Sequence, residues 1–150
     1  MELKDEIRIN ASKDVVCASL QEPEVLRRCI PGCEELTQTA ENTFEATILL
    51  KVGPVKARFS GVVELDTSQA PDALSLSGQG NGGAAGHAKG GADVTLTEAE
   101  GETILSYDAK AEIGGKLAQL GSRLIQSTAK KLAGKFFKSF AEVVEEDRVA

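Results

Sequence analysis

The sequence is poor in the residues that mark several common classes of protein. Its 150 residues include one histidine and three cysteines, and no apolar stretch approaches the roughly 18 residues of a membrane span. The N-terminal segment MELKDEIRIN lacks the apolar core of a signal peptide, so we expect a cytoplasmic protein. Three cysteines are an odd number and too few for a disulfide scaffold. Length and composition fit one globular domain over residues 1–150.

The segment CIPGC, which contains Cys29 and Cys33, is similar to a redox or metal motif. A metal site usually needs three or four ligands, and the single histidine, His87, is far away in the sequence. His87 also has no acid and nucleophile pattern near it, and strand alternation places it on the solvent face. We therefore expect no metal site and no catalytic residue. We interpret the cysteines as small apolar residues around a Pro-Gly turn.

The charged residues are distributed unevenly along the chain. The net charge of −6 argues against nucleic acid as a partner. Residues 114–141, however, carry six basic side chains and no acidic ones. These cations either solvate an exposed helix face beside an acidic remainder or form a docking face for anionic lipid headgroups or an acidic partner. The candidates for membrane or partner docking are Lys130, Lys131, Lys135 and Lys138.

The N-terminal part of the chain predicts one strand followed by two short helices. In ELKDEIRIN a strand places Leu3, Ile7 and Ile9 on one face and charged residues on the other, which is typical of a half-buried strand. Ser12 is a suitable N-cap for the first helix. Pro23 lies near the start of the second helix, and Pro31-Gly32 ends it.

Five further segments alternate with a period of two residues, as strands of a one-sided sheet do. They are TFEATILLKV, VKARFSGVVEL, PDALSLSGQG, AKGGADVTLT and ETILSYDAKAEI. Gly53-Pro54 forms the turn between the first two, and a turn centred on Gly101 joins the last two. From Lys116 the apolar spacing becomes helical over about 30 residues, interrupted by Gly121 and Gly134. This order predicts an α+β fold of the helix-grip type, a curved antiparallel sheet around a long C-terminal helix.

The stretch GQGNGG, residues 78–83, has the spacing of a dinucleotide-binding fingerprint. That fingerprint needs a helix after its glycines to receive the pyrophosphate, whereas the following residues contain more glycines and then alternate. We interpret the stretch as part of a sheet that is short of side-chain volume. Either the long helix lies very close to it, through Gly121 and Gly134, or space remains for an apolar guest.

Several segments together resemble CoxG, a family of carbon monoxide dehydrogenase subunits. They are EPEVLRRCIPGCEEL, KVGPVKARFSG, GQGNGGAAGHAKGGADVTLT and GGKLAQLGSRLIQSTAKKLAGKFF, and the resemblance covers roughly residues 2–145. The family belongs to the START/Bet v 1-like (SRPBCC) helix-grip superfamily. The resemblance therefore implies about seven strands wrapped around the long helix, with a cavity between them. It also implies an accessory protein of a molybdenum-containing carbon monoxide dehydrogenase or a related hydroxylase, linked to membrane recruitment or electron delivery.

The sequence departs from the family pattern in three places. Cys17 stands where such proteins often carry tryptophan, and His87 stands where phenylalanine is common. Many relatives also continue into a long tail with an apolar end, whereas this sequence stops at Ala150. The apolar tail that would anchor such relatives constitutively is thus outside this sequence, whereas peripheral contact with the inner face of the membrane fits the basic helix.

We expect the protein to bind an apolar small molecule, such as a quinone or a lipid, and to contain no covalently bound cofactor. The partner implied by the resemblance is a molybdenum hydroxylase complex. One alternative is an assembly factor that acts only through its surface. The other is a small enzyme that uses Tyr107, the one inward-facing hydroxyl that stands out as a catalytic group. The predicted ligand-binding residues, with Ile30 near the mouth, are Ile30, Phe44, Ile48, Phe59, Leu76, Tyr107, Leu117, Leu120 and Leu124.

Overall fold

The N-terminal elements form as the sequence predicts. The computed structural model describes the backbone of residues 1–149 and the side chains of residues 1–146. The first three elements are β1 (Glu2–Ile9), α1 (Lys13–Ser19) and α2 (Pro23–Cys29). The Ser12 hydroxyl caps α1 by accepting a hydrogen bond from Val15 N at 3.3 Å, and Pro23 begins α2. Gly32, with φ +76°, then turns the chain into the next strand, and a Cβ there would overlap Leu49 O.

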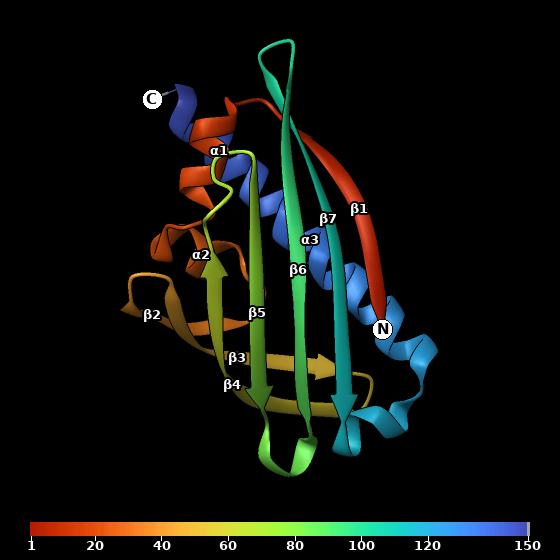
Figure 1. The fold of residues 1–150 in the computed structure, drawn as a ribbon. Coiled ribbons are helices and arrows are strands. Elements are labelled where there is room, and N and C mark those ends of the chain that lie inside the picture. Colours follow the sequence, from red (N-terminus) through yellow and green to blue (C-terminus); the bar gives the residue numbers. More distant parts are fainter. Residues whose placement is uncertain (150) are drawn as a thin grey trace.

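Seven strands form one antiparallel sheet in the order β1-β7-β6-β5-β4-β3-β2. The other six are β2 (Cys33–Ala40), β3 (Thr43–Val52), β4 (Val55–Asp66), β5 (Ala73–Asn81), β6 (His87–Ala99) and β7 (Glu102–Gly114). In Figure 1, β1, β5, β6 and β7 run roughly side by side, whereas β3 runs across them, so the sheet curves strongly. The five segments that alternate with a period of two are all strands of this sheet.

The long helix α3 (Ser122–Val149) runs diagonally across the concave side of the sheet (Figure 1). Together with the curved sheet it makes the helix-grip architecture that the order of elements predicts. In the part of the chain that the structure describes, no helix combines the length and apolar character needed to cross a membrane. The concave side of the sheet faces the amphipathic helix α3, and the candidate site lies in the space between the two.

Two elements differ from the expectation. The strand β2 has no counterpart in the alternating pattern, because it lies at the edge of the sheet and most of its side chains are exposed. The helix α3 starts at Ser122 and not near Lys116, because residues Gly115–Leu120 form a short 3₁₀ helix, η2. Gly121, with φ +96°, separates the two. Apolar residues three or four apart occur in both kinds of helix, so spacing alone does not show this break.

The apolar interior consists of two separate groups of buried side chains. The larger one, here called the main core, joins α1, α2 and the C-terminal half of α3 to the sheet, and its fully buried members include Ile9, Leu105 and Phe140. The smaller one, the hairpin cluster, joins the β3–β4 hairpin to η2 and to the short helix η1 (Gly83–Ala85). Its buried members are Val52, Phe59, Ala85 and Leu117. The two halves of the chain after Lys116 thus pack in different places, with Leu117 and Leu124 at the hairpin cluster and Phe136 and Phe140 at the main core.

Candidate functional site

An apolar cavity of about 460 Å³ lies between the sheet and the N-terminal half of α3. The strands contribute inward-facing side chains that are mostly small or aliphatic, and the helix contributes Ile125, Thr128, Ala129 and Leu132. The wall from the sheet includes Ala46, Ile48, Leu50, Val52, Phe59, Val63, Leu76, Gly78, Gly80, Ala88, Gly90, Ala92, Ala109, Ala111 and Ile113. Among the α3 residues in the wall, Thr128 carries the single hydroxyl, so the cavity offers a ligand a hydrophobic surface with few polar contacts.

The glycines of the sheet have two different roles at this cavity. A Cβ at Gly90 would overlap Lys110 O, and a Cβ at Gly61 would lie 2.9 Å from Gln79 O, so the strands themselves approach too closely for a side chain. A Cβ at Gly80 would find its nearest atom, Ser60 O, at 3.7 Å, an ordinary contact distance. The glycines of the sheet therefore permit close approach between neighbouring strands and also leave volume unfilled.

The helix does not fill this space. No atom other than those of its chain neighbours and its own helix lies within 4 Å of where a Cβ of Gly134 would be, and the same is true of Gly121 at the start of the helix. These two glycines therefore do not provide the close approach of α3 to the sheet that was one of the two alternatives. Of the two explanations for the missing side-chain volume, the one that leaves a cavity fits the structure.

Four of the residues predicted to bind the ligand lie in the cavity wall. They are Ile48, Phe59, Leu76 and Leu117. Two others, Leu120 and Leu124, pack against the hairpin cluster, which closes one end of the cavity. Phe59 and Leu117 belong both to that cluster and to the wall.

The structure places the remaining three predicted residues outside the wall. Phe44 is buried one inward position before Ala46, where the wall from β3 begins. Tyr107 packs against the main core and stacks on Phe137, with ring centroids 4.7 Å apart, and burial raises the pKa of its hydroxyl. Ile30 lines a different hollow, between α2 and α3. Alternation identifies the inward face of a strand, but it does not tell which stretch of that face meets the helix.

Two residues that the sequence pattern did not single out, Thr128 and Ala129, complete the helix side of the wall. Their positions follow Ile125 by three and four residues and precede Leu132 by four and three, so they share its face. Thr128 is polar and Ala129 is small, so neither stands out in a pattern of large apolar residues. A helical stripe that continues through small residues is the signal that finds them.

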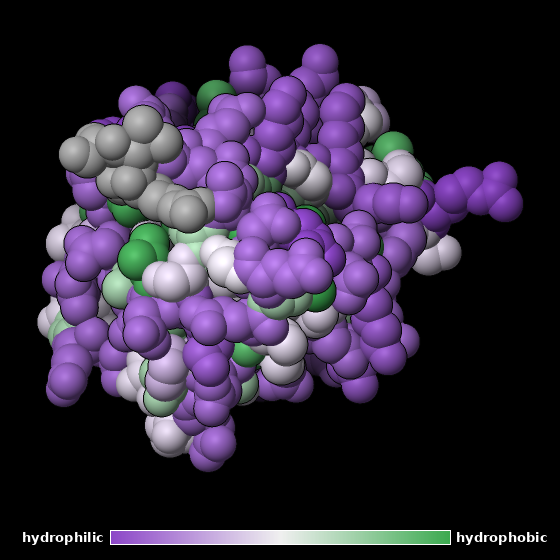
Figure 2. Space-filling model, turned by 90° about the horizontal axis from the view of Figure 1, so that it is seen from above, coloured by the Kyte–Doolittle hydropathy of each residue, from purple (hydrophilic) through white to green (hydrophobic). Residues whose placement is uncertain are grey.

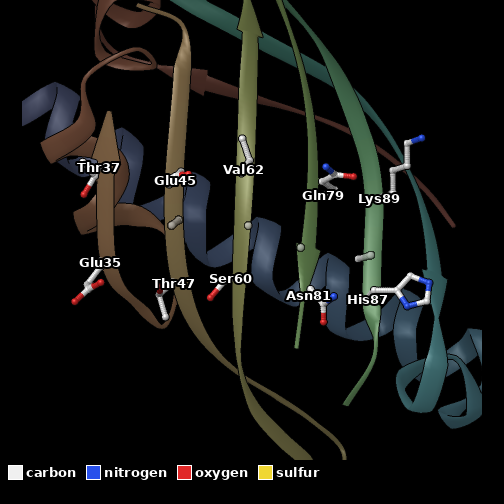
Figure 3. A pocket seen from close by; sticks show the side chains of 14 residues that line it. Glu35, Thr37, Glu45, Thr47, Ser60, Val62, Gln79, Asn81, His87 and Lys89 are labelled. Atoms are coloured by element: carbon white, nitrogen blue, oxygen red, sulfur yellow. The ribbon is translucent and has the colours of Figure 1, made fainter. Parts of the chain in front are cut away.

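A larger hollow of about 830 Å³ lies on the outer face of the sheet (Figure 3). Two rows of register partners cross the strands β2 to β6 there. One row is Glu35, Thr47, Ser60, Asn81 and His87, and the other is Thr37, Glu45, Val62, Gln79 and Lys89. Except for Val62 these side chains are polar, and all of them are exposed or half-buried, with His87 on the solvent face as predicted. The outer hollow is a solvated sheet surface, and the apolar cavity is the better candidate site.

The cations predicted to dock a membrane or partner do not form one patch. Lys130 and Lys131 are exposed along α3, whereas Lys135 and Lys138 line the hollow between α2 and α3 that also contains Ile30. We call this hollow the α2–α3 cleft. The sequence shows the basic stretch, but only the fold shows which of its lysines share a concave surface.

The cysteines of the CIPGC segment are held in poorly reactive forms. Cys29 is buried, Cys33 is half-buried, and burial raises the pKa of both thiols and of the buried Cys17. Among the side chains of residues 1–146, no group of three or more His, Cys, Asp or Glu is placed to hold a metal ion. The arrangement fits small apolar side chains better than a redox pair.

We expect iodoacetamide at pH 8 to alkylate Cys33 first, and Cys17 and Cys29 only when the protein unfolds. A raised pKa leaves less thiolate at this pH, and the two buried thiols are also shielded from the reagent. Peptide mass spectrometry after timed labelling, with and without urea, measures the order. Labelling of Cys29 as fast as that of Cys33 in native protein would contradict it.

Comparison with known proteins places these features in a family. The family model of CoxG, a carbon monoxide dehydrogenase subunit, matches residues 6–145. A conserved protein from Geobacillus kaustophilus has a similar structure, with a TM-score of 0.90 and 27% sequence identity over 97% of this chain and 96% of that one. No curated protein matches the chain.

More distant structures share the fold. A START superfamily protein from Mycobacterium smegmatis has a TM-score of 0.76 and 11% identity, over 97% of both chains. The Zhui aromatase/cyclase from a Streptomyces species has a TM-score of 0.69 and 11% identity, over 100% of this chain and 96% of that one. At such identities the likeness shows the START-like helix-grip fold and nothing about activity. Because the family model spans nearly all of the sequence, the chain belongs to the CoxG family of carbon monoxide dehydrogenase subunits.

Proposed function

We propose that this protein is a non-catalytic accessory protein that holds an apolar small molecule, quinone-like or lipid-like, in its cavity. The observation that carries the proposal is the cavity of about 460 Å³ with an almost wholly apolar wall. Its volume lies within the range of roughly 300–1,000 Å³ found for small-molecule sites. Packed interiors tolerate few voids of this size, because the lining atoms lose dispersion contacts on one side. A ligand restores those contacts.

The composition of the wall selects the class of ligand. Ring or chain carbon atoms would lie against Ile48, Leu76 and Leu132, and the small residues Ala92 and Ala109 leave room for a flat or branched group. Thr128 is placed to donate or accept one hydrogen bond, as a carbonyl or hydroxyl group on the ligand requires. A quinone combines a mostly apolar body with such a group, and it could also accept the electrons that a hydroxylase must pass on.

The accessory role follows from the family. Its name refers to a subunit of carbon monoxide dehydrogenase, so we propose that the partner is a molybdenum-containing hydroxylase of that type. Docking on this enzyme, or recruitment of the enzyme to a membrane, is assigned to the lysines of α3, which are Lys130 and Lys131 along the helix and Lys135 and Lys138 in the α2–α3 cleft. The alternative of a small enzyme named Tyr107 as its catalytic hydroxyl. The Tyr107 ring stacks on Phe137 at the main core and lies outside the cavity wall, which argues against this role.

We expect native mass spectrometry of the protein purified from its own organism to show a stoichiometric adduct of a quinone or lipid. Solvent extraction followed by mass spectrometry then identifies the released molecule. The apo protein, incubated with an extract of the same membranes, should take up the same adduct. A clean apo mass in both experiments would instead favour an assembly factor that acts through its surface.

A further inference from the structure

The α2–α3 cleft collects cations from two parts of the chain that are more than 100 residues apart. It has a volume of about 510 Å³ and is lined by Arg27 and Arg28 of α2 and by Lys135 and Lys138 of α3. Among residues 1–146, Glu142 is the single carboxylate in its wall, so four positive charges and one negative charge give this lining a formal charge of +3. The whole chain has a formal charge of −6, so this cleft is of opposite sign to the protein around it.

Most of these cations have no counter-ion among residues 1–146. Arg27 donates hydrogen bonds to both carboxylate oxygens of Glu24, one helical turn earlier, which fixes the direction of its guanidinium group. Within residues 1–146, Arg28, Lys135 and Lys138 form no ion pair. Like charges that line one hollow repel each other, and an anion inside the hollow removes that cost. The cleft is therefore complementary to a ligand with several negative charges.

We propose that the α2–α3 cleft binds an acidic segment of a partner protein through two or more neighbouring carboxylates. Arginine binds a carboxylate in a bidentate manner, and the more flexible lysines on the opposite wall would pair with further carboxylates. The Ser139 hydroxyl, also in the wall, supplies an additional hydrogen-bond donor. The inference deepens the proposed accessory role, on which it rests, by naming the surface through which a partner docks, and it does not require the cavity to be occupied.

The shape and surroundings of the cleft favour a protein segment over a membrane. A bilayer is a broad anionic plane, and it would bring Glu24 and Glu142, which lie beside these cations, against its own headgroups. A peripheral membrane site also usually inserts large apolar side chains. Among residues 1–146 only Met1 and Val15 are large, apolar and exposed, and neither lines the cleft. Seen from the end of the molecule that carries α1, the surface is mainly hydrophilic (Figure 2). A narrow acidic peptide can enter the cleft without these contacts.

The test uses fluorescein-labelled hexaglutamate and fluorescence anisotropy at low ionic strength, with the full chain. We expect the double substitution Arg28→Glu with Lys135→Glu to weaken binding at least 10-fold, because it reverses one unpaired charge on each wall. The matched control is Lys51→Glu with Lys56→Glu, which changes the net charge equally on exposed positions of β3 and β4 that do not line the cleft. We expect the control to weaken binding less than 2-fold. Circular dichroism verifies that both variants are folded.

Four results would overturn the proposal. They are no binding of hexaglutamate to the unmodified protein, an equal loss in the two double variants, displacement of hexaglutamate by inorganic phosphate but not by chloride of equal ionic strength, and cleft-dependent binding of phosphatidylglycerol vesicles in place of the peptide. Titration of the same variants with a fluorescent fatty-acid analogue reports the cavity separately. If the unmodified protein binds hexaglutamate but not the fatty-acid analogue, the result contradicts the proposed cavity ligand and leaves the cleft proposal standing.

Discussion

Replacing Ala109 with tryptophan is expected to weaken the binding of an apolar ligand about 100-fold, equivalent to about 2.8 kcal/mol at 1.4 kcal/mol for each factor of ten. Ala109 lies on the inward face of β7, opposite Ala92 of β6, and both side chains belong to the cavity wall. An indole ring at this position would occupy the space that the two alanines leave. Titration with a fluorescent fatty-acid analogue, or the ligand occupancy in native mass spectra, measures the effect.

The control for this prediction is Thr95→Trp, which places the same side chain on the exposed face of β6. The protein has no native tryptophan, so each variant gains one emitter, and only the indole at position 109 should emit at a blue-shifted, buried wavelength. Overpacking typically costs about 1–3 kcal/mol of folding stability, so Ala109→Trp alone is not a sufficient test. A second variant, Gly80→Leu in β5, fills the cavity from another strand. Ligand affinity that is unchanged in both folded filling variants would rule out this cavity as the binding site.

Replacing Gly90 with alanine is expected to lower the free energy of unfolding by about 2–4 kcal/mol, whereas Gly80→Ala should leave it within about 1 kcal/mol, on the stabilising side. The Cβ at position 90 would overlap Lys110 O and lie 3.0 Å from both Ala111 Cα and Ala111 Cβ, so the backbone of β6 or β7 must move. The Cβ at position 80 would make only ordinary contacts, and it would project toward the cavity.

Urea denaturation followed by circular dichroism gives both values, and the two variants serve as controls for each other because the chemical change is the same. Equal free energies of unfolding would show that the sheet relaxes around Gly90, and that its close strand approach is not a constraint. A large decrease in the free energy of unfolding for Gly80→Ala would show that the cavity wall at β5 tolerates no added volume.

The strands and their inward faces could be predicted from the sequence because alternation is a local property. In β3 and β4 the register pairs Ile48 with Phe59, and both fall on the predicted inward face. The cap at Ser12 and the turn at Gly53-Pro54 are equally local. The edge strand β2 and the break at Gly121 were missed, because an exposed edge strand buries too few side chains to alternate and a 3₁₀ helix shares apolar spacings with an α-helix.

The candidate site was predicted only in outline. The shortage of side-chain volume in β5, β6 and β7 is visible in the sequence as glycine and alanine at inward positions. That shortage is compatible both with a close helix and with a cavity, and the path of α3 across the sheet decides between them. Tyr107 lies outside the wall because its ring stacks on Phe137 of the C-terminal half of α3, whereas Thr128 belongs to the N-terminal half that borders the cavity.

The sequence by itself therefore determined the class of fold, the order of its elements and the presence of an unusually small-sided stretch of sheet, all of which depend on residues close together in the chain. The tertiary structure alone decided that this stretch encloses a cavity and that Arg28 and Lys135 line one cleft. Both depend on how α3 crosses the curved sheet and packs beside α2. That path is set by the burial of Phe140 and its neighbours in the main core, against elements that are distant in the sequence.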